Sequence, residues 1–142
     1  MEITRTEIFI DAACRGNPGP SSFGLIAVTE DITFEDHGVL GEMTNQEAEF
    51  NALKKALETC VKHNWHNVGI YTDSRLVSSV STGKWKLHSA KLIKIVEELA
   101  RIAYAVKNVP GGKLEVTWLS REDPRMVEVD KLANEALNPR II

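Results

Sequence analysis

Three acidic side chains stand at positions from which they could bind a metal ion together. Asp11 follows the alternating apolar run 7–10, and Asp73 follows a second short apolar run, 67–72. Glu49 lies between them, in a stretch with the apolar spacing of a helix. A strand, a helix and a strand in this order predict a parallel pair joined by a right-handed crossover. Both aspartates would then leave the sheet at its carboxyl edge, and we expect the three carboxylates to converge there.

Glu49 is the carboxylate of this helix that faces the sheet. Its helical neighbours Ala52, Leu53 and Ala56 form the apolar stripe. Glu47 instead continues along the polar face, and we expect it to cap the helix or to be solvated. Because removing an isolated carboxylate from water is unfavourable, Glu49 needs a compensating charge.

A fourth carboxylate, Asp130, lies at the margin of the apolar face of the last predicted helix, beside Ala133 and Leu137. Carboxylates that converge on a small volume repel one another unless a cation lies between them, so we predict a cation site here. From the stretch 7–20 alone, a hairpin with a solvated Asp11 at its tip explains the residues equally well, because turns favour aspartate.

Length and composition predict one compact domain spanning residues 1–142. Of the 142 residues, 43% are hydrophobic, and there is no apolar run of the roughly 20 residues that cross a bilayer. The start of the chain lacks the pattern of a signal peptide, so we expect a cytoplasmic protein. Cys14 and Cys60 belong to no CxxC pair, and we expect reduced thiols.

The charge distribution leaves two interpretations open. The formal net charge of −3 argues against a protein that coats nucleic acid non-specifically. Between residues 74 and 96, however, there is no acidic residue. This stretch is either a solvated helix face or a local surface for nucleic acid. Its cationic side chains are Arg75, Lys84, Lys86, Lys91 and Lys94.

Apolar periodicity predicts an α/β domain with five strands. Three successive strands, at 7–10, 23–29 and 32–40, suggest an antiparallel meander. The remaining expected elements are a helix capped by Thr44 or Asn45 with Val61 in its buried stripe, a strand at 67–72, a short helix at 74–81, a helix at 90–106 with Ile93 inward, a strand at 114–119 and a last helix carrying Asp130.

Four segments of the chain together resemble the motifs of a known family. They are FIDAACRGNPGP (9–20), TNQEAEFNAL (44–53), YTDSRLV (71–77) and VDKLANEAL (129–137). In this order and at this spacing they resemble the motifs of type 1 ribonucleases H. Each motif alone would be a weak signal, but the four together are specific.

The resemblance implies a ribonuclease H-like fold, with a five-stranded mixed sheet flanked by helices. It also implies an endonuclease that hydrolyses the RNA strand of an RNA/DNA hybrid and leaves 3′-hydroxyl and 5′-phosphate ends. In the family the catalytic carboxylates hold two divalent ions, normally Mg²⁺ with Mn²⁺ as a substitute, and carboxylate oxygens suit such ions. The resemblance maps these catalytic and metal-binding carboxylates onto Asp11, Glu49, Asp73 and Asp130.

The resemblance further implies residues that contact the RNA/DNA hybrid. We expect the protein to bind the hybrid as a monomer and not to associate with a membrane. Cys14, Asn17, Asn45 and Gln46 fall where the family contacts the RNA backbone and its 2′-hydroxyls. The remaining contacts are Arg75 beside the third carboxylate, Thr44 at the DNA phosphates, and Trp85 and Lys86 in the region that grips the DNA strand. For Trp85, a half-buried structural role is the alternative.

Three departures from the family pattern accompany the resemblance. Ala12 replaces the glycine that usually follows the first aspartate, and the segment 83–90 is too short for the long basic handle of cellular bacterial enzymes. No histidine lies between Ser120 and Val129, where many members have a mobile one. We expect an altered rate and a lower affinity for the hybrid rather than inactivity.

Two other functions remain open from the sequence. One is a DNA-directed nuclease of the same broad fold, against which the GNPGP and TNQEAEF segments count. The other is a non-catalytic module that binds RNA/DNA hybrids, although a phosphate-binding surface favours lysine or arginine over four carboxylates. His63 and His66 have an HxxH spacing without further ligands nearby, so we do not expect a zinc site.

Overall fold

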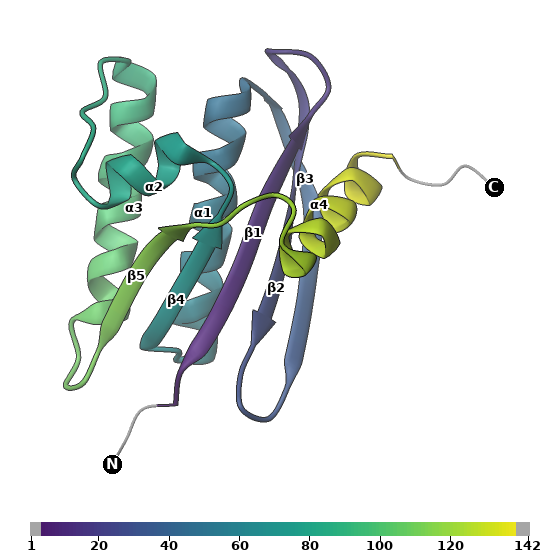
Figure 1. Ribbon diagram of the computed structural model, residues 1–142. Helices are drawn as coiled ribbons and strands as arrows, with labels where there is room; N and C mark the ends of the chain where they lie inside the picture. The colour runs from purple at the N-terminus through teal and green to yellow at the C-terminus, as the bar shows by residue number, and fades with distance from the viewer. Residues whose placement is uncertain (1–3, 139–142) are drawn as a thin grey trace.

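A mixed sheet forms the centre of the molecule (Figure 1). In the computed structural model, which describes residues 4–138, its strands are β1 (Thr6–Cys14), β2 (Gly19–Val28), β3 (Thr33–Met43), β4 (Asn67–Thr72) and β5 (Lys113–Trp118). The strand order is β3-β2-β1-β4-β5. β1, β2 and β3 are antiparallel neighbours, whereas β4 runs parallel to β1 and to β5. The predicted meander and the predicted parallel pair are both confirmed.

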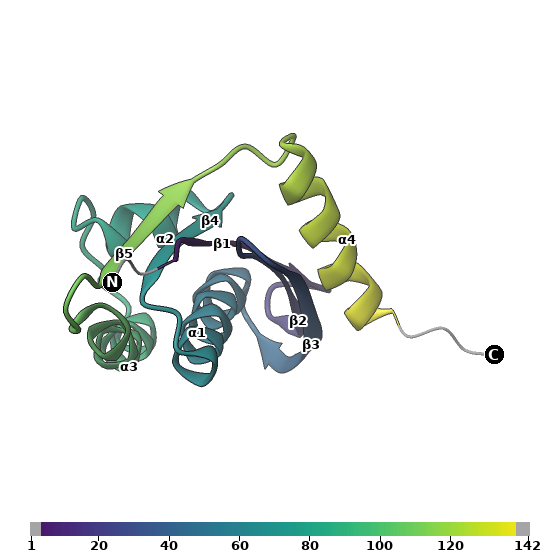
Figure 2. The ribbon, with the colours of Figure 1, turned by 90° about the horizontal axis from the view of Figure 1, so that it is seen from below.

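Helices cover both faces of this sheet. They are α1 (Asn45–His63), α2 (Arg75–Ser81), α3 (Ala90–Lys107) and α4 (Pro124–Leu137). α1 and α3 lie on one face, and α4 lies on the other, against β1 and β2 (Figure 2). None of the helices within residues 4–138 combines the length and the apolar character needed to span a membrane.

The side chains of β1 alternate between the two faces of the sheet, so this strand contributes to both apolar clusters of the fold. Ile8 and Ile10 are buried on the face that α1 covers, together with Phe50 of that helix. Phe9 points to the opposite face, where it packs against the cluster that includes Met126 of α4. One strand thereby contacts both helical layers, which fixes its position in the middle of the sheet.

α4 approaches β2 very closely at Gly24. A Cβ atom on this glycine would lie 2.5 Å from the carbonyl oxygen of Val129 and 2.8 Å from the amide nitrogen of Ala133. The Ser22 hydroxyl also donates a hydrogen bond to the carbonyl oxygen of Ala133. These contacts hold α4, and with it Asp130, against the sheet.

Three local expectations were wrong. β1 continues to Cys14 instead of ending at Asp11, because its antiparallel pairing with β2 extends that far. Val61 and Ile93 were expected to be buried but are 46% and 38% exposed. Each lies at the margin of an apolar stripe, next to a buried residue, and helical spacing does not tell which margin a neighbouring element covers.

Candidate active site

Asp11 lies in β1 at the point where this strand loses its parallel neighbour. β1 pairs with β4 as far as Phe9, whereas its pairing with β2 continues to Cys14. β4 ends at Thr72, and Asp73 follows directly. Asp11 and Asp73 therefore come from adjacent strands at the same edge of the sheet, as the sequence predicted.

Glu49 reaches this edge from the first turns of α1. A capping box fixes the start of the helix: Thr44 Oγ1 accepts a hydrogen bond from the Glu47 amide at 3.2 Å, and Glu47 Oε1 accepts one from the Thr44 amide at 3.2 Å. Glu47 is thus a capping residue, which is one of its two expected roles. It is buried rather than solvated, and it lies 3.3 Å from Lys91 Nζ. Because the cap fixes where α1 begins, it also fixes the direction of Glu49.

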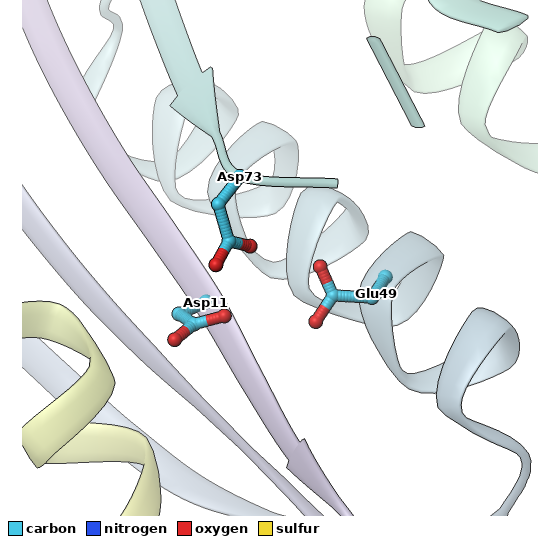
Figure 3. A group of neighbouring side chains, drawn as sticks. All are labelled: Asp11, Glu49 and Asp73. Carbon is cyan, nitrogen blue, oxygen red and sulfur yellow. The ribbon is translucent and has the colours of Figure 1, made fainter. Parts of the chain in front are cut away.

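The carboxylates of Asp11, Glu49 and Asp73 point toward one another (Figure 3). Three oxygen atoms, one from each carboxylate, lie within 4.8 Å of one another. Asp130 of α4 lies outside this tight group but lines the same cavity of about 460 Å³, which we call the acidic cavity. The structure thus brings all four predicted carboxylates to one cavity, and three of them are close enough to share a metal ion.

Burial and mutual repulsion make this cluster difficult to ionise. Burial raises the pKa of Asp11 to about 9, and the charges of Glu49 and Asp73 add to that effect. Burial, together with the charge of Asp73, raises the pKa of Glu49 to about 8. The pKa of Asp73 is also raised, chiefly by burial. A cation among these carboxylates would favour their ionised forms.

The donor set fits a hard divalent cation. Among the residues that the structure describes, the cluster contains carboxylate oxygens and neither histidine nor cysteine. Oxygen donors suit Mg²⁺, Mn²⁺ and Ca²⁺ better than zinc. His63 and His66 are engaged elsewhere: His63 stacks on Trp65, and His66 Nδ1 lies 2.7 Å from the carbonyl oxygen of Val106.

Arg121 lines the acidic cavity and was not predicted from the sequence. It belongs to the segment between β5 and α4. Burial raises the pKa of Glu49 and Asp73, and the positive charge of Arg121 partly opposes this rise. Apolar periodicity could not identify Arg121, because this residue lies in an irregular segment. The available signal in the sequence was a cationic residue shortly before the helix that carries Asp130.

A second cavity, of about 680 Å³, lies beside the acidic cavity, and Asn45 lines both. Asn17 Oδ1 accepts a hydrogen bond from the Asn45 amide at 3.0 Å, which joins the turn after β1 to the start of α1. We call this second site the polar cavity. Its lining includes four predicted substrate contacts, Asn17, Thr44, Asn45 and Gln46. It also includes Ser89, which was not predicted, and Lys91, which belongs to the cationic stretch 74–96.

Cys14, another predicted contact, lines neither of these cavities. Its Sγ atom lies 2.7 Å from the carbonyl oxygen of Gly16 and accepts a hydrogen bond from Ser21 Oγ at 3.2 Å. The side chain therefore supports the turn that holds Asn17.

The remaining predicted contacts lie beyond the two cavities. The Arg75 guanidinium stacks on the ring of Trp118, 4.0 Å from its centre, and Trp118 Nε1 donates a hydrogen bond to the carbonyl oxygen of Asp73 at 3.1 Å. Trp85 is 52% exposed, and Lys86 beside it is exposed too. Both residues are therefore accessible in the segment between α2 and α3, and an exposed fraction of about one half leaves both interpretations of Trp85 open.

Comparison with known proteins identifies the family. The RNase H family profile matches residues 4–137. A ribonuclease H of Bradyrhizobium diazoefficiens is 34% identical over 146 residues, which cover 96% of this chain and 92% of that protein. The crystal structure of RNase H1 from Halobacterium salinarum has a TM-score of 0.83 at 30% identity, over 96% of this chain and 99% of that one. LC11-RNase H1, solved in complex with an RNA/DNA hybrid, has a TM-score of 0.81 at 29% identity, over 94% and 96% of the two chains.

Some relatives are much longer than this protein. Three mycobacterial proteins are 29% identical over 131 residues, and the chain spans about a third of their length, 34%. The family profile nevertheless covers almost all of this chain, and the mixed sheet has the architecture of the ribonuclease H-like fold. The chain therefore belongs to the RNase H family, in its type 1 branch.

Proposed function

We propose that this protein is an endoribonuclease that hydrolyses the RNA strand of RNA/DNA hybrids and leaves 3′-hydroxyl and 5′-phosphate ends. The convergence of Asp11, Glu49 and Asp73 with Asp130 at one cavity is the observation that carries this proposal. The hybrid bound to LC11-RNase H1 supports the same substrate here. The chain would act as a single ribonuclease H domain.

The four carboxylates would hold two divalent ions, Mg²⁺ or, as a substitute, Mn²⁺. When bound, such ions favour deprotonation of the attacking water and stabilise the charge that develops on the leaving oxygen. Since the pKa values of Asp11 and Glu49 are raised to about 9 and about 8, protons compete with metal for the same oxygens. Metal binding should therefore strengthen as the pH rises toward these values.

The polar cavity would receive the RNA strand. Asn17, Asn45 and Gln46 offer amide and carbonyl groups that can hydrogen-bond to 2′-hydroxyls and to phosphate oxygens. Because Asn45 lines both cavities, a ribose held there lies directly beside the carboxylates. Recognition of the 2′-hydroxyl would thus place the next phosphate for cleavage.

The DNA strand would lie against Thr44 and the basic stretch. The Thr44 hydroxyl oxygen accepts a hydrogen bond within the helix cap, so its hydrogen remains free to donate to a phosphate. Trp85 and Lys86 offer an aromatic face and a cation on an accessible segment. Arg75, stacked on Trp118, presents a second cation beside Asp73.

Ala12 marks a difference from the usual site. It lines the acidic cavity at the position where the family has glycine, so its methyl group would narrow the approach of the ribose. We expect this to lower the rate without changing the products.

Substitution Asp73→Asn tests the proposal, because it removes one ligand charge from the cluster while retaining the size of the side chain. A nuclease should lose nearly all cleavage of the hybrid and still bind it. The matched control is Asp31→Asn, which removes the same charge from an exposed turn between β2 and β3.

Cleavage is measured with a labelled hybrid in Mg²⁺, and binding by the anisotropy of the same hybrid. Full cleavage by Asp73→Asn would refute the assigned site. Absence of cleavage by the unmodified protein, with hybrid binding retained, would replace the enzyme by a non-catalytic binding module.

A further inference from the structure

Trp118 holds the main chain at Asp73 through its side chain. Thr72 and Trp118 are partners in the parallel pairing of β4 with β5, and the Leu119 amide donates a hydrogen bond to the carbonyl oxygen of Thr72 at 2.8 Å. The next carbonyl oxygen along the chain, that of Asp73, accepts a hydrogen bond from Trp118 Nε1 at 3.1 Å. An indole N–H thus continues the pairing of the two strands by one residue past the end of β4.

Both peptide units that flank the Cα atom of Asp73 are therefore held. In the unit before it, the carbonyl of Thr72 is bound by the Leu119 amide. In the unit after it, the carbonyl of Asp73 is bound by the indole, and the Ser74 amide donates a hydrogen bond to Thr72 Oγ1 at 3.0 Å. Because a peptide unit is planar, holding these two units fixes the direction of the Cα–Cβ bond between them. The carboxylate of Asp73 is thereby aimed at the other two carboxylates of the cluster (Figure 3).

The ring of Trp118 is itself held by the first residue of α2. The guanidinium of Arg75 lies 4.0 Å from the ring centre, which is the distance of a cation–π contact. Since Arg75 follows Asp73 by two residues, one short segment contacts the same indole twice. Trp118 is 37% exposed and lines neither the acidic cavity nor the polar cavity, so its effect on the site passes through this segment.

We propose that Trp118 is a positioning residue that holds the carboxylate of Asp73 in the orientation suited to a divalent ion. This inference rests on the proposed function. The carboxylates of the cluster repel one another when no cation lies between them, and Asp73, partly exposed at a strand end, could turn toward solvent to relieve this repulsion. The hydrogen bond from the indole opposes that turn, so the ligand is already oriented in the metal-free protein.

A positioning role and a purely structural role lead to different results. If the indole only packed on the end of the sheet, its loss would lower the melting temperature and leave the metal affinity of the folded protein unchanged. If it orients Asp73, loss of the N–H donor weakens metal binding. The melting temperature in chelator then changes little, because relief of the carboxylate repulsion offsets the lost hydrogen bond.

The experiment replaces Trp118 in two ways. Trp118→Phe removes the N–H donor and keeps a smaller aromatic face for Arg75. Incorporation of 3-benzothienylalanine at position 118 by a suppressor tRNA removes only the donor, because a sulfur atom takes the place of the N–H in a ring system of similar size. Trp65→Phe is the matched control, since Trp65 stacks on His63, the last residue of α1, and lines neither of the two cavities.

Calorimetric titration with Mn²⁺ in the absence of hybrid measures the metal affinity. Both replacements at position 118 should bind Mn²⁺ about fivefold more weakly than the unmodified protein, the factor that corresponds to one neutral hydrogen bond of about 1 kcal/mol. At saturating Mn²⁺ they should lower kcat about tenfold, between that factor and the roughly hundredfold effect of a misplacement of about 1 Å. The KM for the hybrid, and all three quantities in Trp65→Phe, should change by at most about twofold.

The outcomes distinguish this inference from the proposed function. If the unmodified protein cleaves the hybrid and both replacements keep its Mn²⁺ affinity within about twofold, the role of Trp118 is refuted and the ribonuclease stands. Weaker Mn²⁺ binding in Trp118→Phe but not in the benzothienylalanine protein would also overturn it, because the ring and not its donor would then matter. If the unmodified protein binds Mn²⁺ without cleaving the hybrid, the proposed function falls and the titration still decides the role of Trp118. If it binds no Mn²⁺, both proposals fall.

Discussion

Replacing Asp11 by asparagine should stabilise the metal-free protein. Asp11 is 5% exposed, and its pKa is raised to about 9 by burial and by the neighbouring carboxylates. Asparagine has nearly the same shape, and its Oδ1 atom can still accept the 2.9 Å hydrogen bond from the Ala12 amide. Asparagine is neutral at every pH, so the variant avoids the free-energy cost of keeping Asp11 protonated in the metal-free fold.

The magnitude follows from proton linkage. The folded-state pKa lies above the ordinary value of 3.8, so the metal-free protein loses stability as the pH rises from about 4 toward about 9. At about 1.4 kcal/mol per pH unit, the penalty at pH 7 is at most about 4 kcal/mol. Because Glu49 and Asp73 carry part of the same repulsion, we expect a gain of about 2 kcal/mol in the free energy of unfolding, or about 6 °C in Tm.

Urea and thermal denaturation in chelator, from pH 5 to pH 9, measure this effect. Asp11→Asn should be more stable than the unmodified protein at pH 8, and its stability should depend less on pH. Mg²⁺ should stabilise the unmodified protein and have little effect on the variant. An Asp11→Asn protein that is less stable at pH 8, or as pH-dependent as the unmodified protein, would refute the account of the cluster; Asp31→Asn controls for loss of an exposed charge.

Two other predictions concern the elements that position the carboxylates. Gly24→Ala should destabilise the fold by about 3 kcal/mol and lower cleavage, because its methyl group would meet α4 backbone at 2.5 Å; urea denaturation and activity measured together test this, and an unchanged midpoint would contradict it. Glu47→Ala should cost about 1–2 kcal/mol by removing the capping box, whereas Glu47→Gln, which keeps the acceptor and loses the charge facing Lys91, should cost less. Equal losses in the two Glu47 variants would show that the ion pair, not the cap, stabilises α1.

The sequence predicted the carboxylate site through the order of its elements. Asp11 and Asp73 each follow an apolar strand, and Glu49 lies on the sheet-facing side of the helix between them. The carboxyl ends of neighbouring parallel strands lie at the same edge of a sheet, so the convergence of these residues followed from the topology. The apolar spacing of the last helix placed Asp130 at the margin of the buried stripe, and the resemblance of the motifs assigned it to the same site.

Apolar periodicity could not predict the environment of residues in irregular segments or at the margins of helical stripes. Arg121 has no repeating neighbours, and Lys91 was one of several cations in a stretch whose orientation the sequence does not specify. Val61 fits a helical stripe as well as its buried neighbour Cys60 does, yet it lies at the exposed margin. The burial of such residues depends on which element packs against them. That element can lie far away in the sequence, so local spacing does not reveal it.

Cleavage of a labelled RNA/DNA hybrid by the unmodified protein tests the central claim most directly. The hybrid, both single strands and both homoduplexes are each incubated with Mg²⁺, with Mn²⁺ and with chelator. We predict metal-dependent cutting confined to the RNA strand of the hybrid, with 3′-hydroxyl and 5′-phosphate ends. Cutting of DNA, or no cutting in either metal while the hybrid remains bound, would contradict the claim.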